Sequence, residues 1–434
     1  MASAEPPRRK RRALSHVGGA IALTGGSSEE RAALETALSV SSDESTSMKH
    51  VHGFHSYPAR LHPETAGRLI EAFSPAGASV LDPFCGSGTV LVEALIRGRR
   101  GHGVDANPLA IELSWLKTRA AHARWLGTIE DSAKAVAVHA DARRTDRSGS
   151  TRRYGGQDLA LFAPHVLLEL DGLRDGISRV SSPEQARALA LVLSAILTKV
   201  SRRGGDASTR TGTKRIASGY TIKLFARKAT ELVRRVHEFE ALLPERPPAV
   251  KLELGDARRL GSVRPGSIDL VLSSPPYAGV YDYYEHHKLR FRWLGLEARG
   301  FEQSEMGSRR QARSAKPDQA LADFSRDLAA CLREIGRCLA IGGRAALVVA
   351  DSVLGGRALY ADDLVGQLAP PAGLKVLARA AQIRPHFHTP TRDAFQHRPR
   401  AEHLILLSRD AKAKERLPTP GRPSHDRPTG GRGR

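Results

Sequence analysis

The stretch ASVLDPFCGSGTVLVEALIRGRRGHGVDANPLA, residues 78–110, decides the fold of this 434-residue chain. Its start predicts a short strand over Ser79–Pro83, because apolar residues lead directly into a glycine turn. The apolar spacing of Thr89–Arg97 then predicts a helix, and a second strand ends at Asp105. Strand, glycine turn, helix and strand form the opening of a doubly wound α/β sheet, so we expect a Rossmann-like fold.

The glycine turn, FCGSG over residues 84–88, is a candidate ligand site. Gly86 and Gly88 lack Cβ atoms, so the backbone there can approach a ligand closely. Asp82 precedes the turn, and Asp105 ends the next strand, where a carboxylate can accept hydrogen bonds from ribose hydroxyls. The third glycine of GxGxxG, which allows close packing beside a pyrophosphate, is missing. We therefore predict S-adenosylmethionine rather than NAD; a glycine-rich turn without a ligand is the alternative.

Strand patterns return beyond residue 245, in VKLELGDARRL, SIDLVLSSPPY, GRAALVVADS and AEHLILLSR, with a helical stretch, DFSRDLAACLREIGRCLA, among them. Between these two groups of strands the pattern is mostly helical, with apolar residues three to four apart. We therefore expect one domain over residues 49–410, interrupted by a helical insertion at about 120–245. Residues 1–48 and 411–434 show little apolar patterning, and we expect both to be disordered basic tails.

The strand IDLVL leads into Ser274-Pro275-Pro276-Tyr277, the strongest signal in the chain. An exocyclic amine of a nucleobase is a poor nucleophile because its lone pair is delocalised into the ring. Its methylation therefore needs two acceptors aimed at the amine hydrogens. The Ser274 hydroxyl and the Pro275 carbonyl are the candidate acceptors, and the two prolines make that carbonyl rigid. Tyr277 offers a flat face to an extruded base. A polar loop after a buried strand is the alternative interpretation.

The acidic residue of LELGDARRL, Asp256, ends the strand before IDLVL. At that place a carboxylate can reach the amino group of an adenine, so we count Asp256 among the candidate cofactor contacts. Capping of a helix over ARRL is the competing role.

No metal site is predicted. The three cysteines, at positions 85, 331 and 338, are too few for a disulfide scaffold or a cysteine zinc site, and they favour a reducing, cytoplasmic compartment. Cys331 and Cys338 share one helical face, which is typical of a core position. The histidines at 52, 55, 62, 286 and 287 have none of the spacings of known zinc motifs.

The net charge of +21 indicates a polyanionic partner, because residues 51–410 carry +15 of it and the excess therefore belongs to the folded body. A chain that spans a membrane is excluded, since no apolar run approaches the ~18 residues required.

Two stretches are candidates for contact with nucleic acid. The first is a basic loop with Lys199, Arg202, Arg203, Arg210, Lys214 and Arg215. The second is 281–316, where aromatic and basic residues alternate; a helix burying Tyr281, Tyr284 and Trp293 is the alternative interpretation of this stretch.

Together, these segments resemble those of the amino-group DNA methyltransferases, which modify N4 of cytosine or N6 of adenine. DPFCGSG is similar to the cofactor loop of that family, VDANP to its ribose-binding position, and SPPY to its catalytic tetrapeptide. HGFHSYPARLHPETAGRLI resembles the element that closes over the methionine end of the cofactor, with Tyr57 and Pro58 as candidate contacts. The cofactor-binding positions that match are Asp82, Phe84, Gly86, Gly88 and Asp105.

The resemblance implies S-adenosylmethionine as the cofactor and DNA as the substrate, with either a restriction endonuclease as a partner or a solitary role. The serine at the first position of the tetrapeptide favours cytosine over adenine. Two other acceptors stay open, guanine in RNA and the glutamine amide of a protein, because related tetrapeptides serve those reactions too. A non-catalytic nucleic-acid-binding protein on the same scaffold is a further alternative. The oligomeric state is not indicated by the sequence.

Overall fold

The computed structural model describes residues 19–40, 44–119, 123–203, 212, 214–384 and 389–410. Its centre is an eight-stranded sheet in these described residues, with the strand order β1-β9-β10-β6-β5-β2-β3-β4. The five strands from β4 to β6 in this order are parallel, and β10 lies antiparallel between β6 and β9. The strands are β1 (Ile21–Gly25), β2 (Ser79–Asp82), β3 (Arg100–Asp105), β4 (Val250–Leu254), β5 (Ile268–Ser273), β6 (Leu339–Ala350), β9 (Leu374–Ile383) and β10 (Ala401–Arg409).

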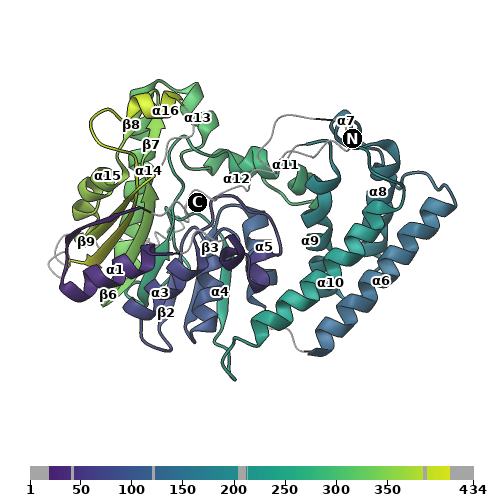
Figure 1. Cartoon of the computed structure of the whole chain (residues 1–434), viewed down its shortest axis with the longest axis horizontal. Helices are drawn as coiled ribbons and strands as arrows, with labels where there is room; N and C mark the ends of the chain where they lie inside the picture. The colour runs from purple at the N-terminus through teal and green to yellow at the C-terminus, as the bar shows by residue number, and fades with distance from the viewer. Residues whose placement is uncertain are drawn as a thin grey trace, which may run out of the picture.

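Helices cover both faces of this sheet, which confirms the predicted Rossmann-like α/β fold (Figure 1). On one face lie α1 (Ser28–Leu38), α3 (Pro63–Phe73) and α4 (Thr89–Ile96), packed against Leu270 and Leu272 of β5. On the other face α14 (Pro317–Cys338) and α15 (Ala361–Leu368) pack against residues that include Val271. Each of these three β5 residues has no exposed surface, as expected for a strand covered on both sides.

A bundle of helices between β3 and β4 occupies the range where the sequence predicts a helical insertion (Figure 1, right). Its buried residues, among them Leu170, Leu193 and Phe225, form a core continuous with α5 (Pro108–Thr118) and α11 (Tyr283–Leu294). The bundle is therefore packed against the sheet domain through its own apolar contacts. The helices are α6 (Ala123–Thr145), α7 (Gly156–Leu161), α8 (Pro164–Ser178), α9 (Pro183–Val200) and α10 (Tyr220–Glu240).

The prediction of a disordered tail over residues 1–48 is wrong for its second half. β1 pairs antiparallel with β9 as an edge strand, and α1 begins with a capping box in which Ser27 and Glu30 bond each other's backbone N–H groups. Leu34 and Leu38 of α1 are buried against the sheet. These contacts are tertiary, so the weak local apolar pattern did not reveal them. Residues 1–18 and 411–434, the other tail predictions, lie outside the described residues.

Short elements make the remaining connections, and α11 to α13 follow β5 directly. They are α2 (Glu44–Ser47), η2 (His50–Gly53), α12 (Arg299–Ser304), α13 (Arg309–Ser314), the hairpin β7 (Ser352–Leu354) and β8 (Arg357–Leu359), η3 (Pro370–Ala372) and α16 (Thr389–Ala394). Cys331 and Cys338 are buried in the core on α14, as the sequence predicts. In the part of the chain that the structure describes, no helix has the length and apolarity to cross a membrane.

Candidate active site

The two motifs singled out in the sequence leave the sheet side by side. β2, which precedes the glycine turn, and β5, which precedes the Ser-Pro-Pro-Tyr segment, are parallel neighbours. The strand order reverses at this pair, since β3 and β4 lie beyond β2 and β6 lies beyond β5. In open α/β sheets, ligands bind outside the carboxyl ends of the strands at such a reversal. The two loops also touch: the Ser273 hydroxyl donates to Asp82 Oδ1 at 2.6 Å.

Two cavities meet at these loops. The first, which we call the loop cavity, is lined by the glycine turn, the end of β3 and the segment after β4. The second, the Tyr277 cavity, is lined by residues of the Ser-Pro-Pro-Tyr loop and the tips of β9 and β10. Ser274 lines both, as do Tyr57, Arg60 and Thr89. A group bound in one cavity therefore lies next to a group bound in the other, with Ser274 at their junction.

Most of the predicted cofactor contacts line the loop cavity: Tyr57, Asp82, Phe84, Gly86, Asp105 and Asp256. Pro58 and Gly88 are absent from the described lining of both cavities. Gly88 has φ +83°, and a Cβ there would lie 2.9 Å from Ser114 Oγ, so this glycine lets α4 approach α5.

The glycine turn is fixed to β3 through Asp105. Both carboxylate oxygens of Asp105 accept backbone N–H groups at 2.8 Å, Oδ2 from Gly86 and Oδ1 from Asn107. Gly86 has φ +50°, a conformation that L residues rarely adopt, and a Cβ there would lie 3.2 Å from the Tyr57 ring. Gly86 thus leaves open the space between the turn and Tyr57.

Three buried carboxyl groups line the loop cavity. Burial raises the pKa of Asp82 to about 7, although hydrogen bonds from Ser273 and the Phe84 N–H oppose the shift. Burial likewise raises the pKa of Asp105 to about 6 and that of Glu305 to about 7. Each shift reports the cost of a buried negative charge, which a positively charged ligand would offset. The chemistry of this lining fits a cation that carries a ribose.

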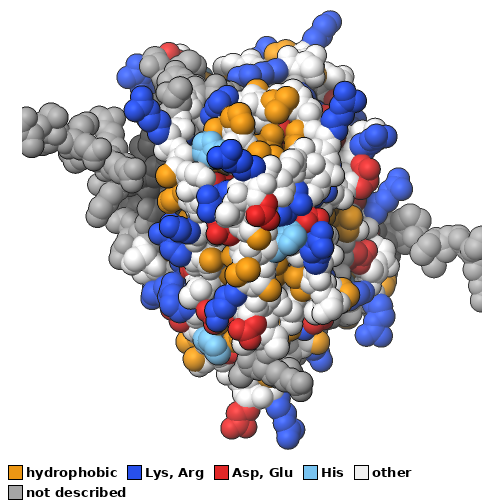
Figure 2. All heavy atoms as spheres, turned by 90° about the vertical axis from the view of Figure 1, so that its right-hand side faces the viewer, with side chains coloured by type: hydrophobic (Ala, Val, Ile, Leu, Met, Phe, Trp, Pro, Cys, Tyr) orange, Lys and Arg blue, Asp and Glu red, His pale blue; other side chains and the backbone are white. Residues whose placement is uncertain are grey.

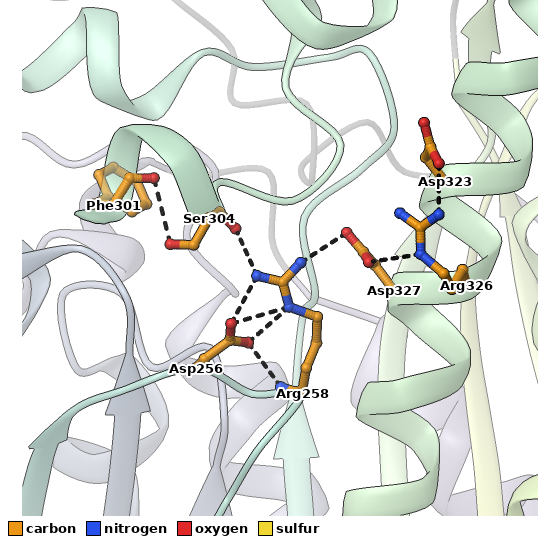
Figure 3. Close-up of polar contacts among 7 residues, drawn as sticks. All are labelled: Asp256, Arg258, Phe301, Ser304, Asp323, Arg326 and Asp327. Atoms are coloured by element: carbon orange, nitrogen blue, oxygen red, sulfur yellow. Dashed lines mark hydrogen bonds and ion pairs between the residues drawn. The ribbon is translucent and has the colours of Figure 1, made fainter. Parts of the chain in front are cut away.

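Asp256 is engaged in an ion pair within the chain (Figure 3). Arg258 donates its Nη2 to Asp256 Oδ2 at 2.7 Å, and its backbone N–H to Oδ1 at 2.9 Å. The same guanidinium bonds Asp327 on α14 at 2.9 Å and the Ser304 carbonyl on α12 at 3.1 Å. Asp256 therefore lines the cavity, but its carboxylate already accepts hydrogen bonds from Arg258. An adenine amino group could bond this carboxylate only alongside Arg258.

Arg258 is a residue that the sequence analysis missed. It connects the segment after β4 to two elements that are distant in the sequence, and the cavity wall beyond it is formed by Phe301, Glu305 and Met306. No local motif marks these positions, because they reach the cavity only through the packing of α12 and α14. In the sequence, the one sign of this contact is that Arg258 follows Asp256 by two positions.

The Ser-Pro-Pro-Tyr residues divide between the cavities. Pro276 lines the loop cavity, and Tyr277 lines the cavity named after it. Pro275 is buried and borders a small cavity on the side of α14 and α15. The Tyr277 hydroxyl donates to Glu402 Oε1 at 3.5 Å, and burial, followed by the Glu402 charge, raises the pKa of Tyr277 well above its usual value.

Lys199 lies in the last turn of α9, and Arg202, Arg203, Lys214 and Arg215 follow on the connection to α10; none of these predicted nucleic-acid-binding residues is in the described linings of the two cavities. Two of them make local bonds: Lys214 Nζ donates to the Arg203 carbonyl at 2.8 Å, and Arg202 to the Ala160 carbonyl at 3.1 Å. Lys199 and Arg215 are exposed, whereas Arg210 lies outside the described residues. The outer face of the helical bundle shows Lys and Arg spread among acidic and apolar side chains (Figure 2).

The second nucleic-acid candidate, residues 281–316, adjoins the site directly. Tyr281 lines the Tyr277 cavity, while Arg309 and Arg313 of α13 line a shallow surface hollow beside Gly279. Trp293 of α11 is buried and donates its Nε1–H to Asp158 at 3.0 Å, so this residue belongs to the core, as the alternative interpretation expects.

Within the described residues, two groups of side chains have ligand atoms close enough to one another to hold a metal ion. His50, His52 and Glu93 form one, and Asp351, Asp362 and His403 form the other. In the first, His52 Nε2 lies 2.7 Å from Glu93 Oε1, and in the second, His403 Nε2 lies 2.9 Å from Asp351 Oδ1. In each group a histidine nitrogen thus already lies within hydrogen-bond distance of a carboxylate oxygen of the chain.

Comparison with known proteins finds similarity to DNA methyltransferases over limited segments of the chain. The family model described as DNA methylase matches residues 8–115, which include the glycine turn and Asp105 but not Ser274. The type II methyltransferase M.MvaI of Kocuria varians is 43% identical over 70 residues, covering 15% of each chain. The type II methyltransferase M.MjaII of Methanocaldococcus jannaschii is 37% identical over 60 residues, covering 14% of this chain and 11% of its own. The chain thus spans only a small part of these relatives.

The solved structures that match this chain have low TM-scores and are distant in sequence. The rRNA methyltransferase AviRa of Streptomyces viridochromogenes is 14% identical, with a TM-score of 0.34, and the match covers 89% of this chain and 99% of that one. A TehB-like SAM-dependent methyltransferase of Corynebacterium glutamicum is 11% identical, with a TM-score of 0.27, and the match covers 79% and 86%. The fold assignment stands on the strand order described above.

Proposed function

We propose that this chain belongs to the amino-group DNA methyltransferase family and methylates an exocyclic amino group of a base extruded from DNA, N4 of cytosine in preference to N6 of adenine. S-adenosylmethionine supplies an electrophilic methyl group on a positively charged sulfur. The observation that carries the proposal is the position of Ser274, which lines both the loop cavity and the Tyr277 cavity. A base in the second cavity would present its amine at the boundary with the first.

The residues of the loop cavity suit the cofactor. Gly86 gives the backbone room beside Tyr57, and Asp105, which lines the cavity at the end of β3, would accept a hydrogen bond from a ribose hydroxyl. Asp82, Asp105 and Glu305 would offset the positive charge of the sulfonium, since each is a buried carboxyl group with a raised pKa. Tyr57, Pro58, Phe84 and Gly88 remain predicted contacts, of which Tyr57 and Phe84 line the cavity.

At the boundary between the two cavities, the protein would act by positioning the amine against the methyl group. The Ser274 hydroxyl and the Pro275 carbonyl would accept the two amine hydrogens, so that the nitrogen lone pair leaves the ring plane and faces the methyl group. Tyr277 would stack on the base, and Pro276 would keep the loop rigid. No covalent intermediate is needed: the sulfur–methyl bond would break as the nitrogen–carbon bond forms, leaving uncharged S-adenosylhomocysteine, and the methylated amine would release its proton to solvent.

The proposed partners follow from this activity. DNA is the proposed substrate, drawn to the chain by the positive charge of the folded body. An enzyme of this kind acts on the DNA of its host in the cytoplasm, and a restriction endonuclease of the same sequence specificity is the candidate protein partner.

The test is transfer of a tritiated methyl group. The purified full-length chain is incubated with labelled S-adenosylmethionine and, separately, with plasmid DNA, total RNA and a mixture of proteins. We expect label in DNA and none from the matched variant Ser274→Ala. Label in RNA or protein alone would overturn the DNA assignment, and no label in any acceptor would overturn the enzymatic one.

A further inference from the structure

Asn107, which has no role in the steps above, lies on the wall of the loop cavity. The residue is only 1% exposed and lines that cavity. It is also the N-cap of α5, where its side-chain oxygen Oδ1 accepts the Leu109 N–H at 3.0 Å. A capping role accounts for Oδ1 alone, because a serine, threonine or aspartate would cap the helix as well. The amide nitrogen therefore needs a separate explanation.

The amide nitrogen of Asn107 makes two contacts of its own. Nδ2 donates to the Tyr57 hydroxyl at 3.2 Å and to Nδ1 of His287 at 3.0 Å. An amide nitrogen carries two hydrogens and cannot accept, so both hydrogens are used, and Nδ1 of His287 is the unprotonated nitrogen of a neutral ring. Among the residues that cap helices well, only asparagine has these two donors. The contacts to Tyr57 and His287 are thus what an asparagine adds at this position.

Tyr57 depends on side-chain contacts for its position. It lies between η2 and α3, in neither a helix nor a strand, and Ser56 and Ala59 close to it are exposed. The centroid of the Tyr57 ring lies 4.9 Å from that of His287 and 6.3 Å from that of Tyr283, both on α11. The bond from Asn107 fixes the hydroxyl end of the same ring. Outside regular structure, such contacts decide where the ring lies.

The bond from Asn107 to Tyr57 completes a circuit of contacts around the glycine turn. Gly86 and Asn107 both donate their backbone N–H groups to the carboxylate of Asp105. Tyr57 in turn lies against Gly86, since a Cβ at that glycine would be 3.2 Å from the Tyr57 ring. All four residues line the loop cavity. Asn107 thus connects Asp105, the proposed ribose contact, to Tyr57, the predicted contact of the methionine end.

We propose that Asn107 is a positioning residue for the cofactor, which holds the Tyr57 ring beside the glycine turn by bonding its hydroxyl and the neighbouring ring of His287. The inference rests on the proposed function, since it takes S-adenosylmethionine to be the molecule bound in the loop cavity. It also gives α11 a part in cofactor binding. His287 belongs to the stretch 281–316, a nucleic-acid candidate in the sequence, and Asn107 bonds it to the wall of the loop cavity.

The experiment titrates the full-length chain and its variants with S-adenosylmethionine in a calorimeter. Asn107→Ser keeps a capping oxygen for α5 but has no amide donors. Tyr57→Phe removes the other end of the same hydrogen bond and leaves the cap in place, and the double variant combines the two. Ser27→Ala is the matched control, because it removes the side-chain cap of α1 at a residue outside the described linings of both cavities. Folding is checked by thermal melting.

We expect Asn107→Ser to weaken the affinity for S-adenosylmethionine roughly 10-fold and Tyr57→Phe to weaken it about fivefold. The double variant should bind about as weakly as Asn107→Ser, because Tyr57→Phe removes a bond that this variant has already lost. With DNA as acceptor, KM for the cofactor should rise in step, while kcat at saturating cofactor stays within about threefold. A general loss of folded chain would instead lower the binding stoichiometry and kcat. Ser27→Ala should leave the affinity unchanged.

Two results would overturn the inference and leave the proposed function intact. One is a folded Asn107→Ser variant that binds S-adenosylmethionine within about twofold of the unaltered chain; if that variant does not fold, the same result for Tyr57→Phe decides. The other is a double variant weakened by the product of the two single losses, about 50-fold, because independent effects multiply. An unaltered chain that binds no S-adenosylmethionine would refute the proposed function and the inference with it, so the two failures are distinguishable.

Discussion

The hydroxyl of Ser273 donates a 2.6 Å hydrogen bond to Asp82 Oδ1, joining the tips of two parallel strands whose residues are 191 positions apart in the chain. The same oxygen accepts the Phe84 N–H at 3.1 Å, so one carboxylate oxygen fixes the start of the glycine turn and the end of β5. Ser274 and the glycine turn are therefore held next to each other by a bond that is buried at both ends. This contact is the physical basis for one continuous site.

If Ser274 is a hydrogen-bond acceptor and Tyr277 a stacking residue, replacing either should lower turnover without weakening cofactor binding. Ser274→Ala and Tyr277→Ala should each lower methyl transfer at least about 100-fold, because a positioned polar group in an active site contributes on that order. Cofactor affinity, measured by calorimetry, should change less than about threefold. Tyr277→Phe keeps the ring and should retain most of the activity. Equal loss of cofactor affinity in both alanine variants would refute these roles.

A side chain at position 86 should weaken cofactor binding by more than backbone strain alone would. Gly86→Ala adds a Cβ 3.2 Å from the Tyr57 ring at a residue with φ +50°. Gly77→Ala is the matched control, since Gly77 has φ +76° and nothing within 4 Å of an added Cβ. Both variants should lose stability by about 1–2 kcal/mol, the cost of a left-handed L residue. Only Gly86→Ala should weaken cofactor binding, by about tenfold or more; equal affinities in the two would remove the ligand assignment.

Buried carboxyl groups predict that cofactor affinity rises with pH. Asp82 and Asp105, with pKa values near 7 and 6, are both protonated well below pH 6 and both ionised above pH 8. A sulfonium is attracted only by the ionised forms, so S-adenosylmethionine should bind more tightly at pH 8 than at pH 5.5, releasing protons as it binds. S-adenosylhomocysteine, whose sulfur is uncharged, should depend less steeply on pH. Identical pH profiles for the two compounds would contradict this account.

The raised pKa values of Asp82 and Asp105 also determine the direction in which pH changes the free energy of unfolding. The folded-state pKa of each group lies above the usual value of 3.8 for an aspartate, so between about pH 4 and pH 7 the folded chain binds more protons than the unfolded one. Without ligand, these two groups should therefore make the free energy of unfolding fall as pH rises through that range. Asp82→Asn, which keeps an Oδ1 acceptor, should reduce that fall, as measured by denaturant titration.

The basic loop predicts a salt-dependent contact with DNA. Lys199 and Arg215 are exposed and belong to the loop singled out in the sequence. Replacing both by Ala should weaken DNA binding and reduce the slope of log affinity against log salt by about 1.8, or 0.9 per lost phosphate contact. Lys134→Ala with Arg234→Ala is the control, because these side chains on the helical bundle are 69% and 57% exposed. Equal changes in the two double variants would show that the charge acts without a defined binding face.

The sequence allowed the central strands and both loops to be predicted because their signals are local. The strand ending at Asp105, the turn with Gly86 and the buried strand before Ser274 each combine an apolar run with a residue of special conformation. Their meeting at one edge followed from the rule for parallel strands, and the lining shared at Ser274 agrees with it.

What escaped prediction depends on contacts between distant segments. β1 and β9 pair across more than 350 residues, and neither strand was identified from its own pattern. Arg258 reaches Ser304 and Asp327, which are 46 and 69 positions away, so its place at the loop cavity had no local signature. Arg384, Arg400 and Glu402 likewise line the cavity beside Tyr277 only because β10 inserts antiparallel between β6 and β9.

The most direct measurement identifies the atom that receives the methyl group. Plasmid DNA methylated by the full-length chain is digested to nucleosides, which are separated and identified by mass spectrometry. The account predicts N4-methyl-2′-deoxycytidine as the main product and its absence with Ser274→Ala. Methyl groups found on C5 of cytosine would contradict it, because carbon methylation does not use the amine acceptors that Ser274 and Pro275 are proposed to supply.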